Sequence, residues 1–273
     1  MITFPNAKIN LGLHVTAKRD DGYHEIETVF YPIPWKDALE CTPAEKLALS
    51  IEGLSIDGAV TTNLVWRAYG LLAQDYDLAP VQLHLLKKIP FGAGLGGGSA
   101  DGAFALQLLN DYFALSLDTA QLQAYAAQLG SDCPFFIENR PALGTGRGEQ
   151  LTPLSLDLSP YHLVVIYPGV TVDTGWAYGQ LSPQPAPKPL QEVIAMPVED
   201  WEIYLTNDFE GPVFAKHPTL EMIKLELYEA GATYAAMSGS GSAVFGLFTE
   251  PQDEWAVARH FSLPREQVLS ASL

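Results

Sequence analysis

The chain has little cysteine, few basic residues and no long apolar run. Two cysteines in 273 residues are too few for a disulfide framework. No apolar run reaches the length of a membrane span, and Met1–Lys8 has neither the basic start nor the apolar core of a signal peptide. These absences favour a cytoplasmic protein that does not bind membranes.

The shortage of basic residues is the second informative absence. Lys and Arg number 15 against 32 Asp and Glu, so the formal net charge is −17. This charge disfavours nucleic-acid binding, which needs a basic face. A polyphosphate could be held only where basic residues gather, as at Lys8, Lys18 and Arg19 or at Lys87 and Lys88. Lys87 and Lys88 are interpreted equally well as solvated charges at a strand end.

Glycine, by contrast, is concentrated in one run. Pro90–Ala100, here called the glycine loop, has five glycines among its eleven residues. An alternating pattern over 81–85 predicts a strand before it, and apolar spacing over 100–113 predicts a helix after it, with Ser99 as the N-cap. A glycine-rich turn into a helix start is typical of a phosphate-binding site. The flanking elements argue against a flexible linker.

Two common nucleotide motifs fit this loop poorly. It has no lysine after its last glycine, which excludes a Walker A motif. The dinucleotide pattern G-x-G-x-x-G does match at Gly92, Gly94 and Gly97. That pattern requires a strand after the helix, whereas Asp118 resembles the cap of a second helix. The dinucleotide match is therefore weak.

The rest of the chain predicts a mixed α+β fold in two parts. The order of the last predicted elements is β-α-β-β-α-β, a split βαβ pattern. A division near 151–159 gives domains 1–155 and 156–273. Expected strands are 9–15, 25–31, 47–51, 161–167, 232–237, 243–248 and 267–270; expected helices are 63–76, 207–214, 219–230 and 254–261; 182–189 is expected to be a proline-rich loop.

Asp132 and Lys8 are the candidates for acid–base chemistry. Asp132 precedes an apolar Pro-Phe-Phe segment, where a carboxylate is costly unless it is paired. The alternative is a turn or capping aspartate. Lys8 and Asn10 share one side of an apolar strand, away from the core. Lys8 could keep Asp132 ionised, although a plain surface lysine is the alternative.

Aromatic residues suggest a site for a planar base. Tyr23 could stack on a base, His24 could hydrogen-bond to it, and Tyr178 could supply a second ring. A tyrosine that only covers a loop is the alternative. Cys133 has no histidine near it in sequence and is interpreted as a small buried hydrophobe. The six histidines show no metal-ligand spacing.

Three of these segments together resemble the motifs of the GHMP kinase superfamily. They are Ala7–Leu11, the glycine loop and Met237–Ser242, in the superfamily's order. Arg19–His24 and Gly130–Phe136 narrow the resemblance to a branch that phosphorylates the 2-hydroxyl of a cytidine-diphosphate-bearing polyol. That reaction belongs to the methylerythritol phosphate route to isoprenoid precursors. The resemblance spans nearly the whole chain.

The resemblance implies a two-domain GHMP kinase fold and a set of site residues. The N-terminal domain would be like ribosomal protein S5 domain 2, and the C-terminal domain would be ferredoxin-like. Asp132 would be the base, and Lys8 would hold it ionised. ATP would come with Mg²⁺ near Ser99. Implied cofactor-binding residues are Asn63, Lys87, Pro90, Phe91, Gly92, Ala93, Gly94, Leu95, Gly96, Gly97, Gly98, Ser99 and Ala100; implied substrate-binding residues are Asn10, Tyr23, His24, Thr174, Tyr178, Gly239 and Gly241.

Some residues depart from the superfamily pattern, and three other functions stay open. Ala100 stands where a second serine is frequent, and Tyr178 where phenylalanine can occur. A homoserine- or mevalonate-type kinase is the nearest alternative, although those substrates offer no base for Tyr23 to stack on. An NAD-type oxidoreductase would depend on G-x-G-x-x-G alone. An inactive sensor would not need both Lys8 and Asp132.

Overall fold

The chain is described by a computed structural model that covers residues 1–55 and 58–273, and it forms two compact units. Each unit draws on separate stretches of sequence. Because unit 2 takes in strands from the start of the chain, the units differ from the linear division at residue 155, which stays a prediction. Unit 1 comprises Met1–Lys8, Trp35–Phe91 and Gly96–Arg140; unit 2 comprises Ile9–Pro34, Gly92–Leu95 and Pro141–Leu273.

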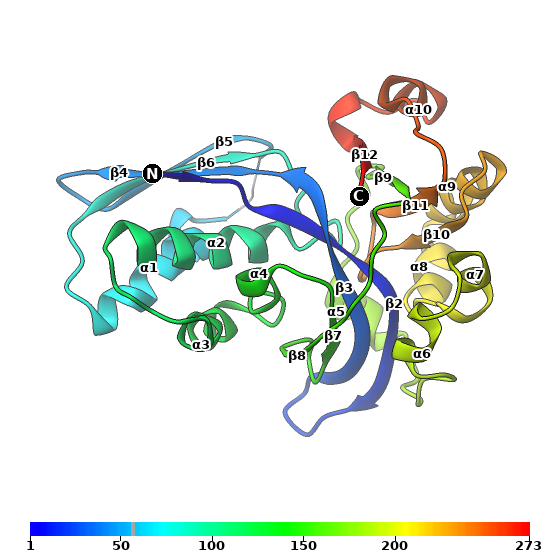
Figure 1. Ribbon diagram of the computed structural model, residues 1–273, viewed down its shortest axis with the longest axis horizontal. Helices are drawn as coiled ribbons and strands as arrows, with labels where there is room; N and C mark the ends of the chain where they lie inside the picture. Colours follow the sequence, from blue (N-terminus) through cyan, green and yellow to red (C-terminus); the bar gives the residue numbers. More distant parts are fainter. Residues whose placement is uncertain (56–57) are drawn as a thin grey trace. The chain divides into compact units, whose positions relative to one another are not determined.

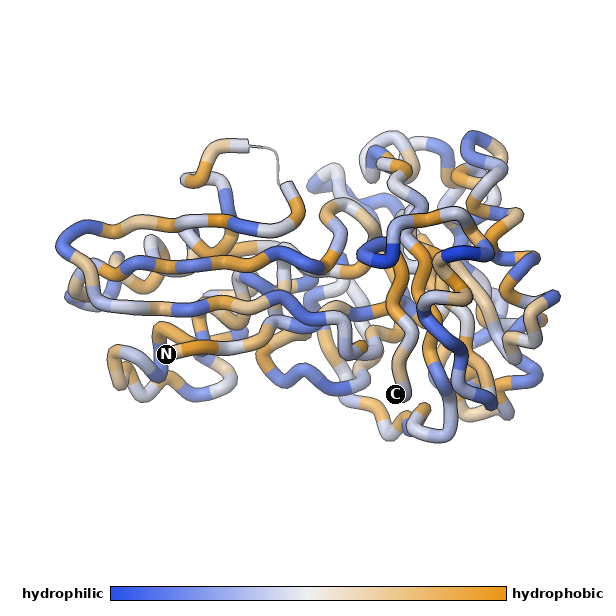
Figure 2. Tube along the Cα trace, turned by 90° about the horizontal axis from the view of Figure 1, so that it is seen from above, coloured by the Kyte–Doolittle hydropathy of each residue, from blue (hydrophilic) through white to orange (hydrophobic). Residues whose placement is uncertain are grey.

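Unit 1 contains a four-stranded sheet in the order β1-β4-β6-β5. β5 runs parallel to β6, and the other pairs are antiparallel. Buried and exposed residues alternate along β6, and hydrophobic and hydrophilic colours change along these strands in Figure 2. One face of the sheet therefore packs on a core. The strands are β1 (Ile2–Thr3), β4 (Ala38–Pro43), β5 (Ala48–Gly53) and β6 (Val81–Lys87).

Helices cover one face of this sheet (Figure 1). The helical segments of this unit are η1 (Val60–Thr62), α1 (Leu64–Asp75), α2 (Gly97–Tyr112), α3 (Thr119–Leu129) and α4 (Phe135–Glu138); α2 contacts β1 and β4, and α1, α3 and α4 pack on α2. α3 begins with a capping box, in which Asp118 accepts from the backbone N–H of Gln121. α3 follows α2 with no strand between them, so the dinucleotide-binding interpretation is wrong.

A second sheet has the order β2-β3-β7-β8. Its strands are β2 (Asn6–Lys18), β3 (His24–Lys36), β7 (Ala142–Thr145) and β8 (Gln150–Pro153). The first ten residues of β2 are all buried, so both faces of this strand are covered. The sequence predicted β2 and β3 as shorter strands. It missed β1, β4, β7 and β8, none of which is longer than six residues.

Unit 2 also holds the sheet β10-β11-β9-β12, whose pairs are all antiparallel. This order confirms the predicted split βαβ arrangement. Leu220, Ile223 and Leu227 of α9 belong to the apolar core beside it. The elements are β9 (His162–Ile166), α5 (Thr174–Gly179), α6 (Leu190–Ile194), η2 (Val198–Asp200), α7 (Trp201–Tyr204), α8 (Glu210–Lys216), α9 (Pro218–Glu229), β10 (Tyr234–Met237), β11 (Val244–Phe248), α10 (Glu254–His260), η3 (Arg265–Gln267) and β12 (Val268–Ser272).

The helix predicted over 207–214 begins later than expected. α8 starts at Glu210, because Asn207 uses its side chain to accept from the N–H of Phe209 at 3.0 Å. The proline-rich stretch 182–189 carries neither helix nor strand, as predicted. Among residues 1–55 and 58–273, no helix has the length and apolar character needed to cross a bilayer.

Candidate active site

The glycine loop joins β6 to α2 and depends on glycine for its backbone conformation. Gly92, Gly94 and Gly96 have φ of +67°, +77° and +69°, in the left-handed region that side chains rarely adopt. Gly94 also lies against another chain segment, since a Cβ there would be 2.0 Å from the carbonyl oxygen of Ser238. The loop can therefore keep this shape only with glycine at these positions.

The loop ends in the first turn of α2, and the helix begins earlier than predicted. Gly96 is the N-cap and Gly97 the first helical residue, so the expectation that Ser99 caps the helix is wrong. The glycine in the left-handed region already turns the chain into the helix, which leaves Ser99 within the first turn. A Cβ on Gly98 would meet nothing within 4 Å. An open helix start with unpaired N–H groups suits an anion.

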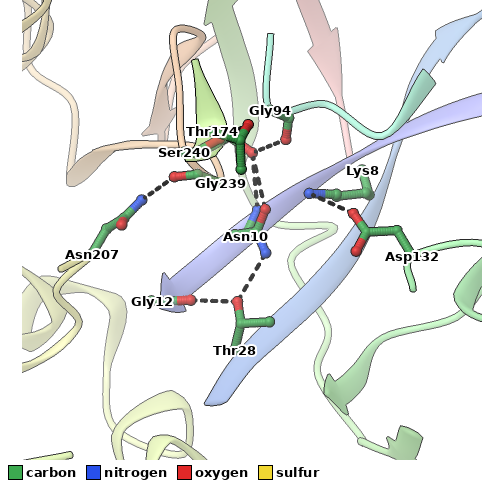
Figure 3. A network of polar contacts seen from close by, with 11 residues as sticks. Lys8, Asn10, Gly12, Thr28, Gly94, Asp132, Thr174, Asn207, Gly239 and Ser240 are labelled. Carbon is green, nitrogen blue, oxygen red and sulfur yellow. Dashed lines mark hydrogen bonds and ion pairs between the residues drawn. The ribbon is translucent and has the colours of Figure 1, made fainter. Parts of the chain in front are cut away.

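Lys8 and Asp132 form an ion pair within unit 1. Lys8 Nζ lies 3.5 Å from Asp132 Oδ2, and Figure 3 shows the two side chains pointing toward each other. Lys8 is buried, with 4% of its side chain exposed against 33% for Asp132. The expectation that Lys8 and Asn10 face away from the core is therefore wrong. β2 is covered on both faces, so its polar side chains are buried as well.

The local sequence explains how Asp132 reaches this position. α3 ends before Gly130, and Phe135 and Phe136 of α4 are fully buried. Asp132 lies in the short turn between these two anchors, next to the ammonium of Lys8. Burial lowers the pKa of Lys8, while the charge and hydrogen bonding of Asp132 act in the opposite direction. The arrangement thus sets a buried lysine directly beside a partly exposed carboxylate.

In unit 2, Asn10 and Ser238 connect β2 to the segment Ser238–Ser242, here called the serine–glycine loop. The N–H of Asn10 donates to Ser238 Oγ at 3.2 Å, and Ser238 Oγ donates to the carbonyl of Gly94 at 2.9 Å. Asn10 Nδ2 donates to Thr28 Oγ1 at 2.9 Å, which donates to the carbonyl of Gly12 at 2.6 Å (Figure 3). A chain of neutral hydrogen bonds thus joins these segments.

Asn207 holds the serine–glycine loop from its other side. Its Nδ2 donates to the carbonyls of Met237 and Gly239, both at 2.8 Å. Gly239 and Gly241 have φ of +58° and +93°, which requires glycine at both positions. Thr174, at the start of α5, reaches the same loop through Ser240, with 3.0 Å between their hydroxyl oxygens. The predicted residues Asn10, Thr174, Gly239 and Gly241 are thus linked through one loop.

The predicted aromatic residues lie in unit 2 but pair differently from expectation. His24 and Tyr178 stack with ring centroids 4.7 Å apart and planes at 15°. Tyr178 also meets the edge of Phe209. Tyr23 is 55% exposed, and the guanidinium of Arg147 lies 4.7 Å from the centre of its ring. A sandwich of one base between Tyr23 and Tyr178 stays a prediction.

Some of the residues predicted near the nucleotide are exposed, and others are buried. Phe91 is exposed, whereas Pro90, Ala93, Leu95 and Ala100 are buried. Asn63 caps α1 by accepting from the N–H of Val65 at 2.9 Å. Lys87 is buried between two carboxylates, so its interpretation as a solvated charge is wrong; Lys88 is exposed. Contact of these residues with a nucleotide stays a prediction.

Cys133 is confirmed as a buried hydrophobe rather than a nucleophile. It is fully buried, and burial raises the pKa of its thiol to about 12. Across residues 1–55 and 58–273, no three His, Cys, Asp or Glu side chains are grouped so that they could hold a metal ion.

Four polar residues that shape the site were not predicted as site residues: Asp37, Asp101, Thr28 and Asn207. Asp37 and Asn207 contact their partners across 50 and 30 or more residues of sequence, a distance that no local pattern spans. Asp101 was visible as an acidic residue in the first turn of a predicted helix, which is ordinary for a helix N-terminus. The sequence therefore predicted the two glycine-rich loops but not the buried polar residues that hold them in place.

Two family models match the chain. The GHMP kinases N terminal domain matches residues 63–140, and the GHMP kinases C terminal domain matches residues 192–262. The first match contains the glycine loop and Asp132, and the second contains the serine–glycine loop.

Several kinases are similar in sequence to this chain over most of its length. A 4-diphosphocytidyl-2-C-methyl-D-erythritol kinase of Parabacteroides distasonis is 51% identical over 92% of this chain and 93% of its own. One of Bacteroides fragilis is 54% identical over 91% and 92%. The crystal structure of a 4-(cytidine 5'-diphospho)-2C-methyl-D-erythritol kinase matches with a TM-score of 0.84 and 34% identity, covering 99% and 98% of the chains. A mevalonate kinase, with a TM-score of 0.72 and 12% identity, shares the fold.

Proposed function

The chain belongs to the GHMP kinases, in the family of the 4-diphosphocytidyl-2-C-methyl-D-erythritol kinases, and we propose that it phosphorylates the 2-hydroxyl of 4-diphosphocytidyl-2-C-methyl-D-erythritol. It is a small-molecule kinase that uses ATP. Its proposed product serves the synthesis of isopentenyl diphosphate. This proposal is supported by identity of about half of all residues to relatives of that name over nearly the whole chain.

The observation that carries the chemistry is the ion pair between Lys8 and Asp132, 3.5 Å apart. We propose that Asp132 takes the proton of the substrate hydroxyl. The hydroxyl oxygen forms a bond to the γ-phosphorus while the bond from that phosphorus to ADP breaks, so Asp132 ends with the proton. The buried ammonium of Lys8 holds Asp132 ionised beforehand and offsets the negative charge that develops during transfer.

The glycine loop is the proposed site for the triphosphate. Its positive-φ glycines and the open first turn of α2 fit a polyphosphate that is held by backbone N–H groups. Mg²⁺ is proposed to lie near Ser99, where it would neutralise phosphate charge. Asn63 and Lys87 are proposed to lie toward the adenine end, and Pro90 and Phe91 are proposed to bind the nucleotide as part of the glycine loop.

The cytidine group is proposed to bind in unit 2, where Tyr23 offers an exposed ring and His24 a ring nitrogen. Consumption of ATP supports the expectation that the protein acts in the cytoplasm. The proposed substrate-binding residues are Asn10, Tyr23, His24, Thr174, Tyr178, Gly239 and Gly241.

Substrate-dependent release of ADP tests the function directly. Purified protein with ATP and Mg²⁺ should release ADP with 4-diphosphocytidyl-2-C-methyl-D-erythritol, and the product should carry phosphate on the 2-oxygen. Mevalonate and homoserine, the substrates of the alternative kinases, should release none above background. ADP release with mevalonate or homoserine but not with the cytidine substrate would overturn the proposed specificity.

Asp132→Asn tests the base. Loss of a positioned general base lowers kcat by about 10²- to 10⁴-fold. ATP binding should stay close to that of the wild type, because the amide keeps the size of the carboxylate. Asp111→Asn, on the exposed side of α2, is the matched control and should keep full activity. Wild-type turnover in Asp132→Asn would remove Asp132 from this role.

A further inference from the structure

A cluster of three buried charged residues lies beneath the glycine loop in unit 1. Lys87 ends β6, Asp37 immediately precedes β4, and Asp101 is the fifth residue of α2. Lys87 Nζ donates to Asp37 Oδ2, and it donates to Asp101 Oδ2 at 2.7 Å. None of the three side chains is more than 2% exposed. One ammonium thus joins two carboxylates in the interior.

Asp37 also binds the chain that enters the glycine loop. Its Oδ1 accepts from the backbone N–H groups of Lys88 at 2.5 Å and Ile89 at 2.9 Å. These residues directly precede Pro90, the first residue of the loop. Both donors are backbone groups. The carboxylate of Asp37 therefore fixes the position of the main chain where the loop begins, and not only the position of a side chain.

Lys87 and Asp101 bind the chain that leaves the loop. Asp101 is five residues beyond the helix cap Gly96, and its carboxylate joins α2 to the end of β6. A Cβ on Gly97 would lie 2.8 Å from Ile89 Cγ2 and 3.4 Å from Lys87 Nζ. The first residue of α2 therefore packs directly on the segment that enters the loop, and the ion cluster closes the loop at its base.

We propose that Asp37, Lys87 and Asp101 are positioning residues for ATP, which hold the two ends of the glycine loop together so that its N–H groups converge on the triphosphate. Lys87 acts through the loop, because its ammonium is buried between two carboxylates of the protein. This inference depends on the proposed role of the loop in ATP binding. Preorganisation of this kind raises affinity, because less order has to be imposed when the ligand binds.

The cluster also contains two carboxyl groups but only one amine. Asp101 Oδ1 has no hydrogen-bond partner among the described residues. Burial raises the pKa of Asp101 to about 8; Lys87 opposes this shift and Asp37 adds to it. The charged groups that face Asp101 are Lys87 from β6 and Asp37 from the segment before β4.

Direct binding of ATP to purified full-length variants tests the proposal. Lys87→Met keeps most of the side-chain stem and removes the ammonium; we expect its Kd for ATP to rise about tenfold or more, as expected when a preorganised loop becomes mobile. The KM for the cytidine substrate should stay within about twofold of the wild type. Leu83→Ala, a buried apolar truncation on the same strand and face, is the matched control and should leave the Kd for ATP unchanged.

A second, more conservative substitution tests the proposal if Lys87→Met does not fold. Asp101→Asn still accepts a hydrogen bond from Lys87 but cannot ionise. Its Kd for ATP should rise severalfold, by less than that of Lys87→Met, because a neutral amide holds the ammonium more weakly than a carboxylate does. Folded Asp101→Asn that binds ATP as tightly as the wild type would overturn the proposal.

The outcomes separate this inference from the proposed function. If wild-type protein does not bind ATP, the proposed role of the loop fails. If wild-type protein binds ATP and folded Lys87→Met binds it equally well, only the positioning role fails. If the Kd for ATP and the KM for the cytidine substrate rise by the same factor, the variant has lost structure generally, and the positioning role is overturned as well.

Discussion

The two glycine-rich loops are anchored by different chemistry. Beneath the glycine loop, Lys87 contacts the carboxyl groups of Asp37 and Asp101, and all three side chains are ionisable. Around the serine–glycine loop, Asn207 and Ser238 use a neutral amide and a neutral hydroxyl to bind backbone carbonyls. Both sets of residues are buried, yet only the first can change its charge.

This difference teaches what each kind of anchor can do. Buried charges bind strongly to each other, but they carry a large desolvation cost that appears whenever one partner is removed. Neutral hydrogen bonds contribute about 1 kcal/mol each and do not respond to pH. The charged anchor should therefore be the stronger and the more pH-sensitive of the two.

Removal of the ammonium should have the largest effect on stability. Lys87→Met leaves Asp37 and Asp101 buried without a cation, and loss of one partner of a buried pair costs about 3–5 kcal/mol. The free energy of unfolding, measured in urea near pH 8, should fall by that amount. Near pH 5 the loss should be smaller, because the abandoned carboxylates can take up protons. A loss that is the same at both pH values would contradict the charged-anchor interpretation.

Asp101→Asn should change how stability depends on pH. The pKa of Asp101 is raised from 3.8 to about 8 in the folded protein, so its contribution to stability is fully present below about pH 4 and is lost as the pH rises through about 8. The wild type should therefore lose stability relative to Asp101→Asn by up to about 1.4 kcal/mol per pH unit within that window. Urea unfolding of both proteins across the window measures it. Parallel curves would show that Asp101 does not titrate there.

Asn207→Ala should have the next largest effect, and it should not depend on pH. The change leaves the carbonyls of Met237 and Gly239 and the N–H of Phe209 without their partner. Unsatisfied buried polar groups cost about 2–3 kcal/mol in total, less than the cost of an abandoned charge. The free energy of unfolding should fall equally at pH 6 and pH 8. If the loss in free energy of unfolding changed with pH, the two anchors would not differ in their response to pH.

The contrast between the anchors marks what the sequence could predict. The glycine loop, the split βαβ arrangement and the candidates Lys8 and Asp132 depended on local patterns or on resemblance. The burial of Lys87 did not, because it requires Asp37, which lies 50 positions earlier and shows no periodic pattern. Ser99 was a reasonable N-cap by residue type, yet Gly96 in the left-handed region ended the loop first. Long-range polar partners are set by tertiary packing.

Ser238→Ala should have the smallest effect and gives the finest test of the neutral anchor. The change removes one hydroxyl, which accepts from the N–H of Asn10 and donates to the carbonyl of Gly94. Since Asn207 still holds the serine–glycine loop, the free energy of unfolding should fall by only about 1 kcal/mol, and equally at pH 6 and pH 8. Ser240→Ala, in the same loop but less buried, is the control and should change stability by less than about 0.5 kcal/mol. A loss in Ser238→Ala as large as that in Asn207→Ala would mean that the hydroxyl, rather than the amide, is the main support of this loop.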